Sequence, residues 1–224
     1  MHPCSKREKK VGHITHNIIF DVDGTLWDTT QVVTKSWNKA ITEVGGTKTV
    51  LTAAVFQKEF GKTLDIIADD LFPDADAGQK EILVQRCCAC EHEALLNGTE
   101  NLLFPHVTET LRSLSERCRL FIVSNCQCGY IELFMKKGGV EPYITDIECY
   151  GNTGKGKGEN LRLLMERNHL KEAVYVGDTQ GDYEATVFAG IPFIFAKYGF
   201  GAPESYSLAI SEIKELLRIF LNKH

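Results

Sequence analysis

The sequence predicts an α/β protein whose core is a doubly wound parallel sheet. Short apolar segments rich in β-formers are expected as strands near 18–22, 119–124, 144–149, 173–177 and 192–196. Amphipathic segments follow them, and we expect helices near 106–117, 129–138, 159–168, 181–189 and 207–222. Regular alternation of this kind predicts an open sheet with helices on both faces and a ligand site at the carboxyl ends of the strands.

Length and charge narrow the class of protein. The chain has 224 residues, enough for a buried core and one smaller unit. Its formal net charge of −5 argues against nucleic acid or an anionic membrane as a partner. Residues 1–17 are polar and basic, lack the apolar run of a signal peptide, and are expected to form a flexible extension. We therefore expect a cytoplasmic monomer or homodimer.

The first strand ends in two carboxylates. Ile18–Asp28 reads IIFDVDGTLWD, so an apolar run stops abruptly at Asp21 and Asp23. Buried carboxylates are costly unless something neutralises them. Gly24 permits a sharp turn, and Thr25 offers a hydroxyl and a backbone N–H. The pattern favours a site for a divalent cation and a phosphoryl group; the alternative is an acidic turn after an edge strand.

Polar residues also follow two later strands. RLFIVSN ends in Ser124 and Asn125, and AVYVGDTQGD places Asp178 and Asp182 four residues apart. A strand that ends in such a pair of acids contributes little to a core. Because the carboxyl ends of parallel strands share one edge of the sheet, that edge is where this fold places its chemistry.

The stretch DVDGTLWD resembles the first motif of the haloacid dehalogenase superfamily, in its phosphatase branch and close to the phosphoglycolate phosphatase-like group. The resemblance runs from Ile18 to about Gly201 and implies a Rossmann-like core. It implies that Asp21 is the nucleophile and Asp23 the general acid/base. Dehalogenases of the superfamily lack the second acid, so Asp23 argues against carbon–halogen chemistry.

The same resemblance implies the other site roles. Ser124 would occupy the second motif, with Asn125 and Thr25 also binding the phosphoryl group. Mg²⁺ is the implied cofactor, because hard oxygen ligands suit it. Its site would be formed by Asp21, the Asp23 carbonyl, Asp178 and Asp182.

Two lysines fit the third motif. In GKGKGEN, an alignment on lysine-proline-x-proline-acid selects Lys155, with glycines in place of both prolines. An alignment on a lysine-glycine-x-asparagine helix start selects Lys157. We prefer Lys157 as the catalytic lysine and assign Lys155 to substrate binding, but both alignments remain open.

The segment 30–101 reads as an all-helical insertion between the first two motifs. It resembles the C1 cap of this superfamily and divides the core into 18–29 and 102–224. Within it, Gly61–Leu64 is similar to a substrate-facing cap loop, although Thr63 replaces the usual proline. Lys62 would meet a substrate carboxylate or second phosphate; the alternative is an ordinary solvated lysine.

A C-x-x-C pair, Cys87 and Cys90, lies on the last helix of this insertion, with Cys88 between them. The pattern allows a zinc or redox site. However, no second pair with zinc-site spacing follows, so we favour reduced thiols that pack as small hydrophobic side chains.

These features predict a Mg²⁺-dependent phosphatase that hydrolyses a small phosphorylated, phosphoglycolate-like metabolite through an aspartyl-phosphate. One alternative is a sugar phosphomutase of the β-phosphoglucomutase type, although such enzymes usually carry an arginine near Gly61, where this chain has Lys62. Others are a pyrophosphatase or nucleotidase on the same scaffold, and a non-catalytic binding protein.

Overall fold

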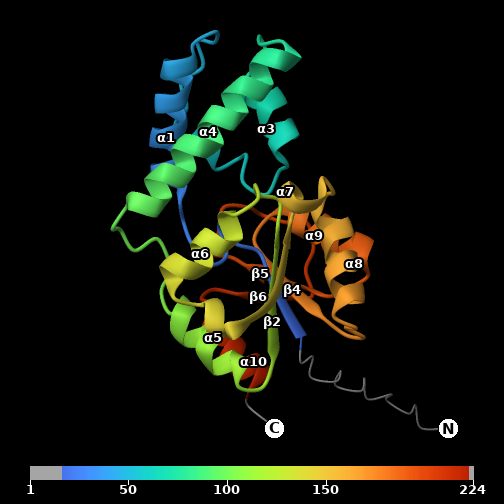
Figure 1. Cartoon of the computed structure of the whole chain (residues 1–224). Coiled ribbons are helices and arrows are strands. Elements are labelled where there is room, and N and C mark those ends of the chain that lie inside the picture. The colour runs from blue at the N-terminus through green and yellow to red at the C-terminus, as the bar shows by residue number, and fades with distance from the viewer. Residues whose placement is uncertain (1–16, 222–224) are drawn as a thin grey trace, which may run out of the picture.

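The computed structural model describes residues 17–221. Its centre is a parallel six-stranded sheet with the order β3-β2-β1-β4-β5-β6. Figure 1 shows this sheet in the lower half of the view. The strands are β1 (Asn17–Phe20), β2 (Arg119–Ser124), β3 (Ile144–Cys149), β4 (Val174–Gly177), β5 (Phe193–Ala196) and β6 (Leu208–Ile210). The predicted doubly wound α/β sheet is thus confirmed. Strand β1 lies inside the sheet, between β2 and β4.

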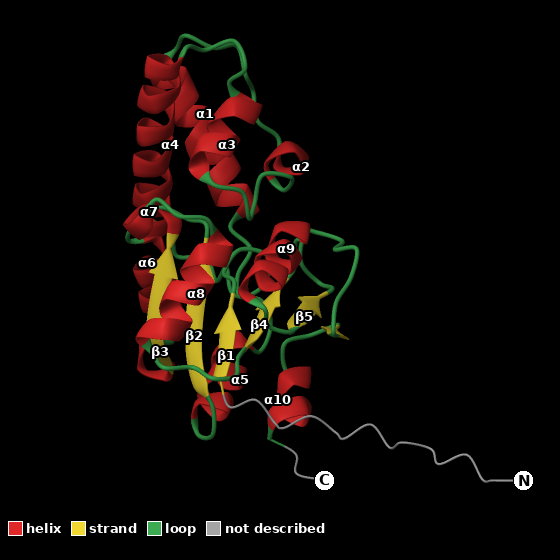
Figure 2. Cartoon of the chain, turned by 90° about the vertical axis from the view of Figure 1, so that its right-hand side faces the viewer, coloured by secondary structure: helices red, strands yellow, loops and turns green. Residues whose placement is uncertain are grey.

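Helices cover both faces of the sheet (Figure 2). Along β1, Ile18 and Phe20 point into one apolar core and Ile19 into the other, as the two-residue period of a strand requires. The first core is closed by α5 (Val107–Ser115), α6 (Tyr130–Gly138) and α10 (Glu215–Phe220), and the second by α8 (Lys157–Arg167) and α9 (Gln180–Ala189). Burial on both faces explains why these strands read as continuous apolar runs.

Four helices lie between β1 and α5 and form a unit that we call the helical insertion. They are α1 (Thr30–Val44), α2 (Ala53–Phe56), α3 (Leu64–Leu71) and α4 (Ala77–Asn97). The insertion has an apolar core of its own, built around Trp37, Phe56 and Leu83. It stands beyond the carboxyl ends of the strands (Figure 2).

The prediction of one helix over 207–222 is wrong. Its first part is strand β6, which pairs with β5, and α10 begins only at Glu215. Ser207 N donates to Phe193 O and Lys197 N donates to Ile210 O, so the backbone here completes the sheet edge. Sheet pairing overrides the helical pattern at this place. The structure also contains α7 (Tyr150–Thr153) and a 3₁₀ turn (Glu141–Tyr143), which the sequence did not predict.

The expected N-terminal extension falls on residues 1–16, outside the described part of the chain, and on Asn17, which begins β1. Within the described part, no helix is long and apolar enough to cross a membrane. Cys87 and Cys90 are buried in the core of the helical insertion as free thiols. Their burial agrees with packing as small hydrophobic side chains.

Candidate active site

Asp21 lies just beyond β1 and contacts Lys157, which is buried beside it. Its Oδ1 is 3.0 Å from Lys157 Nζ, and the same Nζ is 2.5 Å from Asp182 Oδ1. All three side chains are almost fully buried. Burial raises the pKa of Asp21 to about 6, although the Lys157 ammonium opposes the shift. A buried carboxylate that ionises near neutral pH beside a cation suits a nucleophile.

Asp178 faces Asp21 from the end of β4. Its Oδ2 accepts a hydrogen bond of 2.6 Å from Phe200 N, and its Oδ1 accepts one of 3.3 Å from Thr25 Oγ1. Gly24, at φ +78°, leaves room for this carboxylate, because a Cβ there would lie 2.2 Å from Asp178 Oδ2. The glycine therefore provides both the turn after β1 and the space for Asp178.

Asp182 has most of its hydrogen-bonding capacity taken by the protein. Its Oδ2 accepts hydrogen bonds from the N–H groups of Asp178 and Thr179 and from Thr179 Oγ1, at 2.9–3.0 Å. Thr179 and Asp182 together form the capping box of α9. This side chain is therefore arranged to hold Lys157 and the loop after β4 in place.

The acids form a cluster that fits a divalent cation. One carboxylate oxygen each from Asp21, Asp178 and Asp182 lie within 4.8 Å of one another. Burial and the neighbouring acids raise the pKa of Asp178 well above its ordinary value. Lys157 supplies one positive charge for three carboxylates, so a hard cation bound by oxygen would complete the charge balance. Because Asp182 is already engaged, Asp21 and Asp178 are the two side chains best placed to hold it.

Asp23 has different surroundings from Asp21. Its Oδ1 accepts hydrogen bonds from Trp27 Nε1 at 3.0 Å, Thr29 Oγ1 at 2.9 Å and Tyr130 OH at 2.7 Å. Burial raises its pKa to about 7, against the effect of the Tyr130 hydrogen bond. The three donors occupy a single oxygen and fix the carboxyl group. A carboxyl that titrates near pH 7 can both give and take a proton under physiological conditions.

The phosphoryl-binding candidates differ in what they contact. Ser124 is buried at the end of β2, and Thr25 is fully buried against Asp178. Asn125 Nδ2 donates a hydrogen bond of 2.8 Å to Gly61 O, and this bond links the core to the helical insertion. Its buried Oδ1 has no hydrogen-bond partner among residues 17–221.

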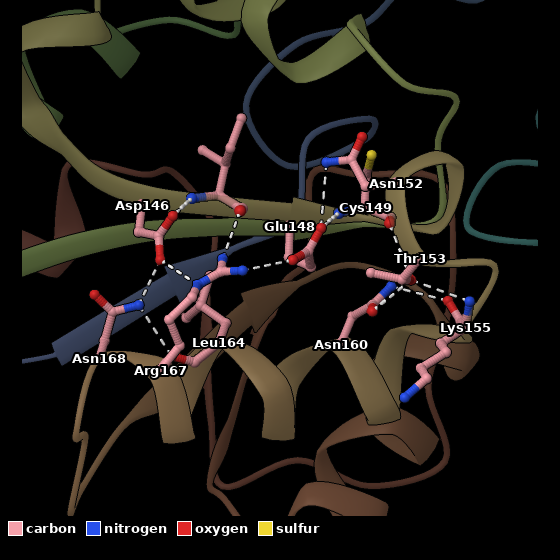
Figure 3. Close-up of polar contacts among 11 residues, drawn as sticks. Asp146, Glu148, Cys149, Asn152, Thr153, Lys155, Asn160, Leu164, Arg167 and Asn168 are labelled. Atoms are coloured by element: carbon pink, nitrogen blue, oxygen red, sulfur yellow. Dashed lines mark hydrogen bonds and ion pairs between the residues drawn. The ribbon is translucent and has the colours of Figure 1, made fainter.

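The structure separates the two candidate lysines. Lys157 enters the acid cluster, whereas the Lys155 side chain is exposed. Figure 3 shows how the loop before α8 is held: Asn160 Nδ2 donates to Lys155 O and its Oδ1 accepts from Thr153 Oγ1, both at 2.8 Å. Thr153 Oγ1 also accepts from Lys155 N at 3.0 Å. The loop thus ends with Lys157 as the first residue of the helix.

The far end of α8 is fixed to β3 (Figure 3). Arg167 Nε lies 2.9 Å from Asp146 Oδ2 and its NH1 lies 2.8 Å from Glu148 Oε2. Asn168 Nδ2 donates to the same Asp146 carboxylate at 2.5 Å. The carboxyl end of the helix that carries Lys157 is therefore attached to strand β3.

Lys62 lies at the rim of a cavity between the helical insertion and the core. Its Nζ is 2.9 Å from Glu59 Oε2 and 2.7 Å from Asp70 Oδ2. The cavity has a volume of about 40 Å³ and is lined by Asp23, Ser124, Asn125 and residues of the insertion. The expected contact of Lys62 with substrate competes with these two carboxylates.

Sequence reasoning missed two residues of this region. Tyr130, on α6, donates to Asp23 from a distant part of the chain, and no local pattern marks it. Glu91, on α4, is buried in the cavity wall. The sequence carries a signal for the burial of Glu91, because its four-residue spacing from Leu83, Cys87 and Leu95 places it on one face of the helix, and the structure buries all four residues.

Comparison with known proteins identifies the family. The model of haloacid dehalogenase-like hydrolases matches residues 18–196. The chain belongs to this family. The resemblance inferred from the motifs is thus confirmed, and so is the enzyme class, a phosphoric monoester hydrolase.

Several relatives are phosphoglycolate phosphatases. The one from Xanthomonas campestris pv. campestris (strain 8004) is 28% identical over 188 residues, covering 82% of this chain and 83% of the relative. The phosphoglycolate phosphatase from Vibrio parahaemolyticus is 25% identical, and the match covers 90% of this chain and 94% of the relative. Both alignments cover more than four fifths of this chain.

Two solved structures share the fold of this chain. A predicted phosphoglycolate phosphatase from Haemophilus somnus superposes with a TM-score of 0.82 at 19% identity, over 92% of this chain and 98% of the other. CbbY from Rhodobacter sphaeroides, in complex with phosphate, superposes with a TM-score of 0.78 at 18% identity, over 92% of this chain and 99% of the other. The fold is therefore shared by proteins that are less than 20% identical to this chain.

Proposed function

We propose that this hydrolase cleaves the phosphate monoester of a small metabolite, with Asp21 as nucleophile and Mg²⁺ as cofactor. The observation that carries the proposal is the pairing of two acids with different surroundings. Asp21 lies in the acid cluster against Lys157, whereas burial raises the pKa of Asp23 against the effect of its hydrogen bond from Tyr130. Such a difference assigns distinct roles to the two carboxyls.

The first role is attack on phosphorus. The Asp21 carboxylate would displace the alcohol and form an aspartyl-phosphate, which divides one hard displacement into two easier ones. Lys157, Ser124 and nearby backbone N–H groups would stabilise charge on the phosphoryl oxygens. Asp21 and Asp178 would hold Mg²⁺, which, when bound, supplies positive charge that lets an anionic ester approach a carboxylate.

The second role belongs to Asp23. Its protonated carboxyl would donate to the departing alkoxide, and the resulting carboxylate would take a proton from the water that hydrolyses the aspartyl-phosphate. Trp27, Thr29 and Tyr130 all donate to its Oδ1, whereas its Oδ2 has no hydrogen-bond partner within residues 17–221 and is available for this proton transfer.

We assign the helical insertion the role of a cap. Phe60 stacks on Phe200 of the core, with ring centroids 5.0 Å apart, and Gly61 O accepts from Asn125. These contacts close the insertion over the carboxyl ends of the strands. A closed cap excludes water while the phosphoryl group is transferred.

Hydrolysis of p-nitrophenyl phosphate, with and without Mg²⁺, tests the proposal. Asp21→Asn should abolish turnover, whereas Asp74→Asn, an exchange on an exposed loop, should leave it unchanged. Product analysis with glucose 1-phosphate distinguishes hydrolysis from transfer to a second position on the sugar. Turnover that survives Asp21→Asn, or that needs no divalent cation, would contradict the proposed mechanism.

A further inference from the structure

We propose that Glu91 selects the alcohol of the phosphate ester and favours an alcohol that carries an ammonium group over one that carries a carboxylate. The inference rests on the proposed phosphatase function and specifies its substrate class. It concerns the cavity on the side of Asp23 that faces the helical insertion.

The position of Glu91 is fixed by two donors. Its Oε2 accepts a hydrogen bond of 2.6 Å from Trp37 Nε1, and its Oε1 accepts one of 2.9 Å from Gln127 Nε2. Burial raises the pKa of Glu91, whereas the hydrogen bonds from Gln127 and Trp37 lower it. Since both partners are N–H donors, both oxygens act as acceptors, which favours the ionised carboxylate. Each oxygen keeps further acceptor capacity for a ligand.

The cavity receives the alcohol and not the phosphoryl group. Asp23, Ser124 and Glu91 line it, whereas Asp21, Asp178 and Lys157 do not. A phosphoryl group between Asp21 and Ser124 would direct its ester oxygen toward Asp23 and the rest of the alcohol toward Glu91.

Charge in the cavity opposes an anionic alcohol. Three carboxyl groups line it, and Lys62, the one basic side chain among its described lining residues, already has Glu59 and Asp70 as partners. A ligand carboxylate would thus meet Glu91 without a free cation to offset it. An ammonium group would instead neutralise Glu91.

The walls and the size of the cavity fit a short cationic group. Aromatic rings of Trp37, Phe56, Phe60 and Tyr130 contribute to its lining, and ring faces attract cations. Its volume of about 40 Å³ restricts the cavity to a short group. Ethanolamine is such an alcohol, because it places only two carbons and a nitrogen beyond the ester oxygen.

The test compares kcat/KM for phosphoethanolamine, glycerol phosphate and phosphoglycolate, with Mg²⁺, and uses p-nitrophenyl phosphate to establish phosphatase activity. We expect the wild type to prefer the cationic over the anionic ester by at least about tenfold, with the neutral ester between them. Glu91→Gln keeps the size and hydrogen-bonding capacity of the side chain and should remove most of this preference through KM. Glu93→Gln, on the exposed face of the same helix, should preserve it.

Equal or faster hydrolysis of phosphoglycolate by the wild type would overturn the inference, and so would a preference that Glu91→Gln leaves intact. The wild-type ranking decides the matter even where a variant folds poorly. Absence of p-nitrophenyl phosphate hydrolysis by the wild type would instead overturn the proposed function, and this inference with it.

Discussion

The buried ammonium of Lys157 lies 3.0 Å from the Asp21 carboxylate, close enough to neutralise part of the negative charge of the acid cluster. Lys155, two residues earlier, has an exposed side chain. We expect Lys157→Met to lower kcat/KM by about 10³-fold, because charge on the phosphoryl group loses a fixed cation. Lys155→Met is the matched control and should retain activity. Steady-state kinetics of both variants measure the difference, and equal losses would contradict it.

Removing Lys157 should also destabilise the fold. Breaking a buried ion pair leaves carboxylates without compensation and typically costs about 3–5 kcal/mol. Urea unfolding of Lys157→Met without divalent cations should show this loss, and Lys155→Met should unfold like the wild type. A Lys157→Met protein as stable as the wild type would show that Asp21 and Asp182 tolerate the missing cation.

The pH profile should follow Asp23. Because its pKa is about 7, the protonated acid is lost as pH rises through that value, and kcat/KM for an alkyl phosphate should fall. The Tyr130 hydrogen bond lowers this pKa, so Tyr130→Phe should move the falling limb to higher pH. Profiles of both proteins test the assignment, and a limb that moves to lower pH would refute it.

Stability without divalent cations should decrease from about pH 4 to pH 7. The folded protein holds protons on Asp21, with a pKa of about 6, and on Asp23, with one of about 7, against an ordinary 3.8. These two carboxyl groups contribute their full stabilisation of the fold when the pH is below their pKa in the unfolded chain. The stabilisation is lost as the pH rises through their pKa values in the folded protein. For Asp23 alone it amounts to about 4 kcal/mol.

Mg²⁺ should offset this loss. At pH 8 the acid cluster is ionised and can bind the cation, so Mg²⁺ should raise the unfolding temperature, whereas at pH 4 it should have little effect. Thermal unfolding at the two pH values makes the comparison, with Asp178→Asn as the variant expected to lose the response. A response equal at both pH values would argue against carboxylate ligands.

Asn160 should act as a positioning residue for Lys157. Asn160→Ala removes its hydrogen bonds to Lys155 O and Thr153 Oγ1 and should lower kcat more than it raises KM. Asn152→Ala provides the control, because it removes a hydrogen bond to Glu148 on β3 and leaves the bonds of Asn160 in place. Equal kinetics of the two variants would show that the loop holds its shape without Asn160.

The sequence was most informative where a functional group and its structural cause lie next to each other. Asp21, Asp23 and Gly24 occupy one turn after β1, so a short motif revealed the site. Lys157 was ambiguous because Lys155 stands two residues away in the same glycine-rich loop. Only packing of α8 against β3 and α9 determines which lysine is buried.

Residues that act across the fold were harder to predict. Tyr130 reaches Asp23 because α6 packs beside the turn after β1, and its own neighbours in sequence give no sign of this. β6 was mistaken for helix because its three residues form a strand only when β5 offers an edge. Glu91 was recoverable from the spacing of buried residues on α4, which shows that a charged residue on an apolar face merits attention.

The most direct test of the mechanism is an acid-quenched reaction of Asp23→Asn with p-nitrophenyl phosphate. The good leaving group needs little help from an acid, but hydrolysis of the aspartyl-phosphate needs Asp23 as a base. We therefore predict a burst of p-nitrophenolate that matches the enzyme concentration and, on peptide mass spectrometry, a phosphoryl group on Asp21. Steady turnover without a burst, or phosphate on any other residue, would contradict the assignment of Asp21 as the nucleophile.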